Sequence, residues 1–214
     1  MKQEIEITVP TDWSAITLRK YLQLQKDIET YKDNDEAVTA ALFYHLCGVD
    51  APTVHKLDIQ TFTNIQLDLT RFISQTELPL QQFIKIGGVE YGFEPNLSQM
   101  SYGAYVDLGK NETMGINEKW AEAMSILYRP VTKKIGASYQ IEKYIGKIDG
   151  EKFMDVDMSV HFGALSFFFH LLGDLQSATL KFLTDSEEIP TNILTTLERN
   201  GKLIPQSSSS VVMI

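Results

Sequence analysis

The stretch over residues 160–172 is strongly apolar and constrains the fold more than any other part of the sequence. It holds three consecutive phenylalanines at 167–169 and is followed by Gly173 and Asp174. A membrane-spanning helix needs about 20 apolar residues, and this stretch is shorter and contains two histidines. Its apolar residues point in nearly every direction around a helix, which is typical of a helix enclosed by other elements. The sequence therefore predicts a long buried helix over residues 155–183.

Composition predicts one ordinary folded domain. Of the 214 residues, 43% are hydrophobic and 22% are charged, which is close to the globular average. We expect a single compact domain over residues 1–204, with a helical part at 11–75 and a part at 80–204 that mixes a hairpin with helices. Residues 205–214 are expected to follow as a flexible, serine-rich tail with an apolar end.

The net charge and the single cysteine exclude several classes of protein. A formal charge of -9 repels phosphate, so we expect no sequence-specific nucleic acid as a partner. One cysteine cannot form an internal disulfide or a cysteine-rich zinc site. The first residues lack the apolar core of a secretory signal. We therefore expect a chain that is kept in a reducing cytoplasm and has no membrane partner.

The N-terminal residues predict a strand followed by a helix. Polar and β-branched residues alternate over 3–9, as in a strand with one exposed face, and Pro10 ends the alternation. Thr11 or Asp12 would then cap a helix whose apolar face begins at Trp13.

Two further helices are predicted before residue 75. Asn34 would cap the first of them, and Gly48 is placed to end it in the left-handed conformation. Asp58 would cap the second, in which apolar residues recur at steps of three and four.

After residue 80 the pattern becomes mixed. The β-prone runs 83–86 and 89–93 flank two glycines, which suit a two-residue type I′ hairpin turn. Residues 95–116 are expected to form an irregular, partly helical connection. Asn117 would cap a helix that Pro130 closes.

The remaining segments complete the predicted fold. Residues 139–145 are expected to form another weak strand, and a last helix would begin near Pro190 and end at residue 200. The predicted fold class is α+β, mainly helical with one β-hairpin, one or two additional short strands and a long buried C-terminal helix.

The sequence contains no nucleotide-binding or catalytic motif. Residues 146–147 lack the upstream glycine of a phosphate loop. Ser138 does not lie in a nucleophile elbow, and Cys47 comes late on an amphipathic helix, where free cysteines are usually buried and inert. Asp155 and Asp157 fit first-turn acids, favoured by the helix dipole, better than a catalytic pair. We therefore expect no catalytic residues and no enzyme.

The histidines do not predict a metal site. His161 and His170 would lie roughly 180° apart around one helix, so they cannot share an ion. His45, Cys47 and His55 are ligand types that suit zinc, but their spacing matches no zinc motif. We expect packed, hydrogen-bonded histidines, with no metal and no cofactor.

The last four residues form a candidate partner-binding segment. Val211, Val212, Met213 and Ile214 follow four serines, and exposing four apolar side chains to water is unfavourable. Two alternatives stay open. The segment docks on its own core or is disordered, or it docks in a groove of a neighbouring subunit as a C-terminal latch.

An aromatic motif interrupted by glycine and proline runs from residue 91 to residue 130. It reads YGFEPNL at 91–97, MSYGAYVDL at 100–108, then Trp120 and LYRP at 127–130, and DMSVHFGAL follows at 157–165. We expect it to hold an irregular segment against the buried helix, with Arg129 paired with an acid such as Asp107. The residues of this structural motif are Tyr91, Phe93, Pro95, Tyr102, Tyr105, Asp107, Trp120, Tyr128, Arg129 and Pro130.

The order of these motifs resembles that of small structural or assembly proteins of tailed bacteriophages, including the crAss-like podovirus type. The resemblance implies a non-enzymatic virion or assembly protein that acts through protein–protein contacts. Its implied role is a subunit of the portal or head-to-tail connector ring or an internal cargo protein, with a tail assembly chaperone as the alternative. The implied partners are portal, connector or tail subunits and further copies of the chain. The implied location is the host bacterial cytoplasm during assembly, then the virion.

Two other functions stay open at this point. A small-molecule-binding domain or enzyme would need an aromatic pocket lined by His45, His55, His161 or Tyr128 and a titratable group with a perturbed pKa. A protein that binds a host target would be absent from purified particles.

Overall fold

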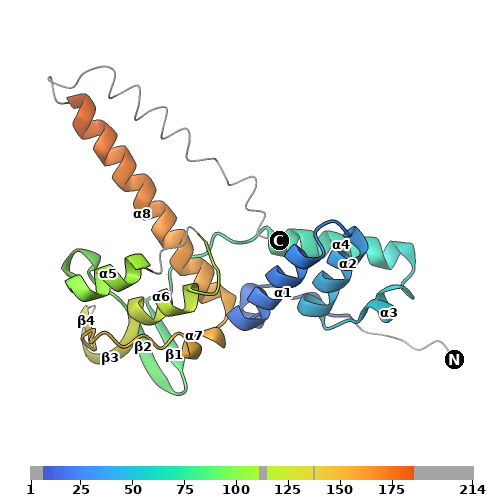
Figure 1. Ribbon diagram of the computed structural model, residues 1–214, viewed down its shortest axis with the longest axis horizontal. Coiled ribbons are helices and arrows are strands. Elements are labelled where there is room, and N and C mark those ends of the chain that lie inside the picture. Colours follow the sequence, from blue (N-terminus) through green and yellow to red (C-terminus); the bar gives the residue numbers. More distant parts are fainter. Residues whose placement is uncertain (1–6, 111–114, 137, 186–214) are drawn as a thin grey trace.

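The computed structural model describes residues 7–110, 115–136 and 138–185, which form a helical half and a mixed half (Figure 1). The elements of the helical half are η1 (Trp13–Ala15), α1 (Leu18–Thr30), α2 (Asp35–Leu42), η2 (Phe43–Cys47), α3 (Ala51–Val54) and α4 (Ile59–Ile73). Those of the mixed half are β1 (Phe83–Ile86), β2 (Val89–Phe93), η3 (Leu97–Gln99), α5 (Tyr102–Lys110), α6 (Trp120–Leu127), β3 (Tyr128–Ile135), β4 (Ser138–Ile141), α7 (Glu151–Met154) and α8 (Met158–Asp185). The fold is α+β and mainly helical, as the sequence predicts.

Polar caps fix the starts of the helices in the helical half. Asn34 accepts a hydrogen bond from the backbone N–H of Ala37, and Asp58 accepts one from Thr61, as predicted. Gly48 has a φ of 72° and ends η2. A side chain at that φ would be strained, so glycine is the residue that suits this helix end.

The start of the chain differs from the prediction. Residues 7–10 have no regular structure, and the other residues of the predicted strand lie outside the described part of the chain. Asp12 caps η1 and Thr17 caps α1, so Trp13 precedes the first α-helix and does not begin it. Tertiary packing explains the difference, because the rings of Trp13 and Phe72 lie 4.3 Å apart between centroids and hold this segment against α4.

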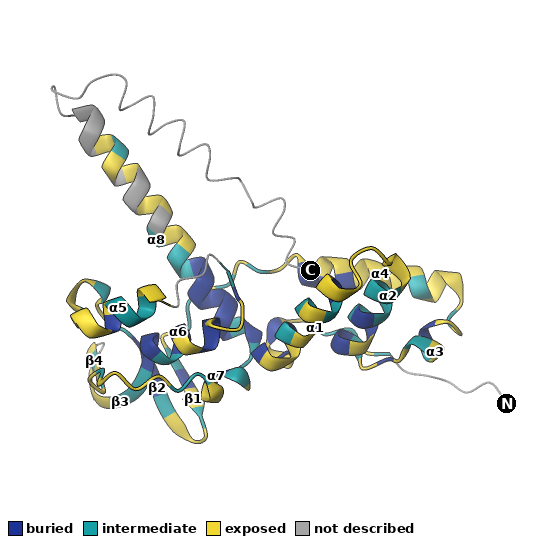
Figure 2. Ribbon diagram, in the orientation of Figure 1, coloured by how far each residue is buried: buried dark blue, intermediate teal, exposed yellow. Residues whose placement is uncertain are grey.

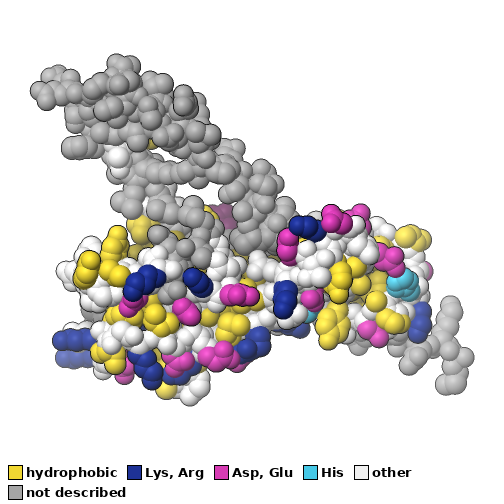
Figure 3. Space-filling model, viewed as in Figure 1, with side chains coloured by type: hydrophobic (Ala, Val, Ile, Leu, Met, Phe, Trp, Pro, Cys, Tyr) yellow, Lys and Arg dark blue, Asp and Glu magenta, His cyan; other side chains and the backbone are white. Residues whose placement is uncertain are grey.

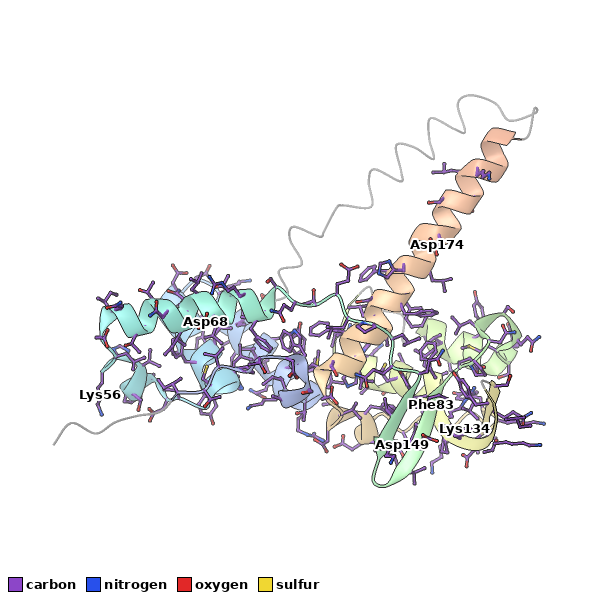
Figure 4. The ribbon with its side chains drawn as sticks, turned by 180° about the vertical axis from the view of Figure 1, so that it is seen from behind. Lys56, Asp68, Phe83, Lys134, Asp149 and Asp174 are labelled. Carbon is purple, nitrogen blue, oxygen red and sulfur yellow. The ribbon has the colours of Figure 1, made fainter. Side chains whose placement is uncertain are left out.

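A four-stranded antiparallel sheet, in the order β1-β2-β3-β4, forms the base of the mixed half. The predicted hairpin is present, and Gly87 and Gly88 have φ values of 58° and 81°, as a type I′ turn requires. The Nζ of Lys134 on β3 lies 3.7 Å from the centre of the Phe83 ring on β1 (Figure 4).

The sequence does not predict β3. The predicted helix ends at Leu127, and the chain continues directly into a strand that contains Pro130, so the proline does not close the helix itself. A residue that precedes proline avoids the helical conformation. Arg129 is therefore extended, and the strand follows the helix without a loop. β4 covers Ser138–Ile141 and is shorter than the predicted strand at 139–145.

Two details of the connection to α6 also differ. The segment 95–116, predicted to be irregular and partly helical, is more regular than expected, because it contains the nine-residue helix α5 and the short helix η3. Lys119 occupies the N-cap position of α6. The predicted cap, Asn117, lies two residues before it and accepts a hydrogen bond from the backbone N–H of Lys119. The helix predicted to begin near Pro190 lies outside the described residues.

The first turns of α8 join the two halves. Phe162 contacts Trp13 and Tyr21 of the helical half, with ring centroids 4.8 and 5.6 Å apart. Further along α8, Phe167 contacts Phe93 of β2 at 5.3 Å. One hydrophobic core therefore includes buried residues of both halves.

Only the beginning of α8 is buried, which corrects the prediction of a helix enclosed along its length. Residues 158–166 are buried apart from Ser159, which is half-buried. From residue 169 onward the described side chains are exposed or half-buried, and the helix leaves the body of the protein (Figures 1 and 2). Apolar residues on all sides of a helix permit burial but do not supply the neighbours that would cover it. No described helix has the length and apolar content needed to cross a membrane.

Gly163 and Gly173 offer a matched test of this arrangement, because they lie on the same helix in opposite environments. A Cβ on Gly163 would lie 2.4 Å from the carbonyl oxygen of Pro79, whereas one on Gly173 would have no neighbour within 4 Å among the described atoms. We expect Gly163→Ala to lower the free energy of unfolding by about 1–3 kcal/mol through overpacking against backbone. Gly173→Ala should raise it by up to about 1 kcal/mol, because alanine favours a helix.

Urea unfolding followed by circular dichroism measures both changes. Equal stability of Gly163→Ala and the wild type would contradict the close approach of the 79–80 segment to α8.

Candidate functional site

The predicted aromatic motif divides into a buried set and an exposed set. The buried set is Tyr91, Phe93, Trp120 and Tyr128, each at most 8% exposed. Tyr102 and Tyr105, in contrast, are 81% and 68% exposed on α5. Pro95 is exposed and Pro130 is half-buried. The expectation that the whole motif packs inward is therefore wrong for the two tyrosines of α5.

The buried set is held by hydrogen bonds as well as by packing. Trp120 donates its Nε1–H to Nδ1 of His161 at 3.1 Å, and Nε2 of His161 lies 3.2 Å from the carbonyl oxygen of Phe153. Tyr128 donates its hydroxyl to the carbonyl oxygen of Gln81 at 2.6 Å. Burial lowers the pKa of His161 to about 4, so the imidazole is neutral at pH 7. Both of its nitrogens are engaged, and His161 is a structural residue.

Arg129 pairs with Glu94 and not with Asp107, which corrects the predicted partner. The side chains of Arg129 and Glu94 are 12% and 10% exposed and form an ion pair between β3 and the end of β2. Register decides this choice. Gly92 faces Arg129 and Phe93 faces Tyr128 across the two strands, so the chain that leaves β2 passes beside Arg129.

Asp107 has other partners. It accepts a hydrogen bond from the Tyr144 hydroxyl at 2.8 Å and forms an ion pair with Lys110 at 2.9 Å. Lys110 and then Tyr144 lower the pKa of Asp107. Burial, followed by the bond to the Asp107 carboxylate, raises the pKa of Tyr144 to about 12. The contact fixes α5 to the loop after β4.

The other histidines and the cysteine do not come together. His45 lies 2.7 Å from an oxygen of Asp27, and the exposed His55 lies 3.1 Å from Glu36. Burial raises the pKa of the Cys47 thiol to about 11, which fits an unreactive packed side chain. Within the described part of the chain, no three His, Cys, Asp or Glu side chains are placed to hold a metal ion.

The remaining sequence candidates have structural contacts. Asp157 precedes α8 and accepts a hydrogen bond from the Ser159 N–H at 3.1 Å, as a helix-start acid does. Asp155 lies before the helix and pairs with Arg19 at 2.9 Å, so its predicted first-turn position is wrong. Ser138 begins β4 at the sheet edge. His170 is exposed on α8 and lies 3.2 Å from Glu77, away from the buried His161.

α5 and α8 each expose aromatic side chains in the mixed half. Tyr102 and Tyr105 are three residues apart and so share one face of α5. Phe169 is 48% exposed on α8, where that helix leaves the body. Aromatic side chains of this kind are enriched at the centres of protein interfaces. These exposed aromatic side chains lie on two different helices.

Sequence reasoning missed the exposure of Tyr102 and Tyr105, although a signal was present. If residues 102–110 form a helix, Ala104 and Leu108 share one apolar face, and the tyrosines fall outside it. In the structure Ala104 is fully buried and Leu108 is half-buried. The other predicted binding segment, Val211, Val212, Met213 and Ile214, lies outside the described residues.

Comparison with known proteins adds no relative. No family model, no curated protein and no solved structure matches the chain.

His161 predicts a specific pH dependence of stability. The unfolded chain takes up a proton near pH 6.5, whereas the folded protein does so only at about 4. The neutral His161 therefore contributes fully to the free energy of unfolding above pH 6.5. This contribution, about 3 kcal/mol in total, is lost as the pH falls toward 4. We expect His161→Gln to flatten this pH dependence in urea unfolding measured from pH 7 to pH 4.5.

Trp120→Phe is the matched control for that experiment. It removes the hydrogen bond to His161 but keeps the titrating imidazole, so it should lower stability at pH 7 while retaining the pH slope. The same slope in His161→Gln and the wild type would contradict the assignment to this residue.

The Arg129–Glu94 pair predicts a large cost for removing one partner. Glu94→Gln leaves a buried arginine charge without compensation and should lower the free energy of unfolding by about 3–5 kcal/mol. The double variant Glu94→Leu/Arg129→Leu should cost less than the sum of Glu94→Leu and Arg129→Leu made singly. A double-mutant cycle, with each free energy of unfolding measured in urea, gives the coupling energy between the two side chains. Glu29→Gln, which breaks an exposed pair with Lys32, is the control and should cost at most about 1 kcal/mol.

Proposed function

We propose that this chain is a non-enzymatic assembly protein of a tailed bacteriophage that acts by binding other proteins. The observation that carries the protein-binding part is α8. Its first nine residues are core, and its continuation carries the exposed Phe169 away from the body. The motif order between residues 91 and 165 supports the phage part of the proposal.

The projecting part of α8 favours a partner for a physical reason. Most helices in proteins are stabilised by tertiary packing of an apolar face, and short helical segments in water are marginal. Beyond residue 168, α8 retains apolar side chains, among them the half-buried Leu171 and Leu180. A second protein surface would supply the packing that the described part of the chain does not.

The proposed role is a subunit of the portal or head-to-tail connector ring, or an internal cargo protein. A tail assembly chaperone is the alternative within the same class. In each case the partners are portal, connector or tail subunits or further copies of the chain. The chain would occupy the host cytoplasm during assembly and, except as a chaperone, the virion afterwards.

An enzyme site beside the aromatic motif has weaker support. The hollow beside the aromatic motif, lined in part by Tyr91, Tyr128 and Lys152, measures about 180 Å³, below the roughly 300–1,000 Å³ typical of ligand pockets. The pKa values of Tyr128 and Tyr144, which also line it, are raised, so neither hydroxyl is poised as a base near neutral pH. His161 is buried, and both of its nitrogens have partners.

Mass spectrometry of gradient-purified phage particles tests the proposal, combined with affinity purification of the tagged chain from infected cells. A connector or cargo protein should sediment with particles, and a chaperone should be absent from particles but bound to tail proteins during infection. Absence from particles together with capture of host proteins alone would overturn the proposal.

A matched pair of variants tests the role of α8. Phe169→Asp should reduce the recovery of phage partners by roughly tenfold, because an interface aromatic commonly contributes more than 1.4 kcal/mol. Ile59→Asp places the same charge at a 78% exposed position on α4 in the other half and should leave recovery unchanged. Equal recovery with both variants would exclude α8 as the contact surface.

A further inference from the structure

A groove with an apolar floor lies between α1, α2 and α3. It encloses about 600 Å³, and its floor is formed by the small side chains of Ala37, Ala40, Ala41 and Ala51. Tyr31 and Tyr44, 46% and 59% exposed, form its walls. We call this hollow the α2 groove. Small floor residues leave room for an inserted side chain, and exposed tyrosines are typical of interface walls.

The rim of the α2 groove is acidic. Asp27, Glu36 and Asp50 line it, and Glu36 is shared with an adjoining hollow of about 400 Å³ that Asp35 also lines. Neither hollow is lined by a lysine or an arginine. Acidic and apolar side chains can be seen together over this end of the molecule in Figure 3. The groove therefore suits an occupant with apolar and basic side chains.

The mixed half carries a segment that presents an exposed apolar side chain between two lysines. Residues 142–150, which we call the Ile145 loop, connect β4 to α7, and Ile145 is 83% exposed. The loop also contains the acids Glu142 and Asp149, and Asp149 pairs with Lys152. Lys143 and Lys147 stand two residues to either side, are exposed, and form no ion pair within the described part of the chain. The longer segment 128–147 contains five basic residues and one acid, Glu142.

The groove and the loop lie in different halves of one chain. Figure 4 shows Lys56, which directly follows His55 of the groove, far from Asp149 of the loop. A loop on one copy can therefore meet a groove only on a second copy, unless the two halves rearrange.

We propose that the Ile145 loop of one copy docks in the α2 groove of the next. Ile145 would lie over the alanine floor, and Lys143 and Lys147 would face the acids Asp35, Glu36 and Asp50. Opposite charges placed in this way steer association and fix its register. The inference rests on the proposed function and specifies its contact between copies.

Such a contact has a defined consequence for assembly. The donor and acceptor surfaces differ, so the contact is heterologous and each copy both donates a loop and accepts one. Repetition of the contact closes into a ring or extends into a filament, depending on the rotation between neighbours. A connector ring is one such closed arrangement.

Charge reversal provides the test. The loop variant Lys143→Glu/Lys147→Glu has an acidic loop and an acidic groove, whereas the groove variant Asp35→Lys/Glu36→Lys keeps both loop lysines and places two lysines at the rim beside Asp27 and Asp50. Analytical ultracentrifugation of the full chain at low salt should show oligomers for the wild type. Each variant alone should show a roughly tenfold or greater loss of self-association. An equimolar mixture of the two variants should restore the oligomers, because the altered loop can then meet the altered groove, and the unaltered loop the unaltered groove.

Two controls keep the test interpretable. Lys85→Glu/Lys119→Glu makes the same change in net charge at exposed positions outside both surfaces and should leave the oligomers intact. Ile145→Ser removes the apolar anchor without changing charge and should weaken association. Circular dichroism and urea midpoints establish that every variant is folded.

A monomeric wild type at low salt and tens of micromolar would overturn the inference, as would failure of the mixture to reassemble. If only the groove variant loses self-association, the groove binds a different basic segment, and the inference is wrong. None of these results affects the proposed function, because that is tested by the presence of the chain in particles.

Discussion

Burial of the first turns of α8 between the two halves is the interaction on which the rest of the structure depends. Phe162 packs against Trp13 and Tyr21 in the core of the helical half. His161 accepts a hydrogen bond from the indole N–H of Trp120 on α6. Gly163 lets the segment near Pro79, which links the halves, pass against the helix backbone. Three consecutive residues thus meet three different parts of the chain, and both halves share one core.

The buried polar side chains named above are held by individual partners and do not gather into a reactive centre, although the Nε of Arg129 is buried without a hydrogen-bond partner. Tyr128 is satisfied by a backbone carbonyl, Trp120 by His161, and Arg129 by Glu94. Such pairs position strands and helices, because a buried donor or charge without a partner is costly. The chemistry that remains available to other molecules lies on the surface, as apolar side chains on α5 and α8, an acidic groove in the helical half and a loop with two exposed lysines in the mixed half.

The fold could be predicted from sequence where the deciding interactions are local. Asn34 and Asp58 cap helices through backbone groups two or three residues away, and the paired glycines define the hairpin by their own backbone freedom. Prediction failed where distant residues decide. Arg129 binds the acid that strand register places beside it, and Trp13 is kept out of the first helix by its contact with Phe72.

The sequence by itself determined the class of the fold, the starts of the two helices capped by Asn34 and Asp58, the turn of its hairpin and the helical character of the segment after residue 157. Only the tertiary structure decided that α8 is covered for its first turns and then leaves the body, and that two tyrosines of the aromatic motif face outward. The physical reason is that helix formation depends on residues within a turn of one another, whereas burial depends on which distant surfaces arrive to exclude water.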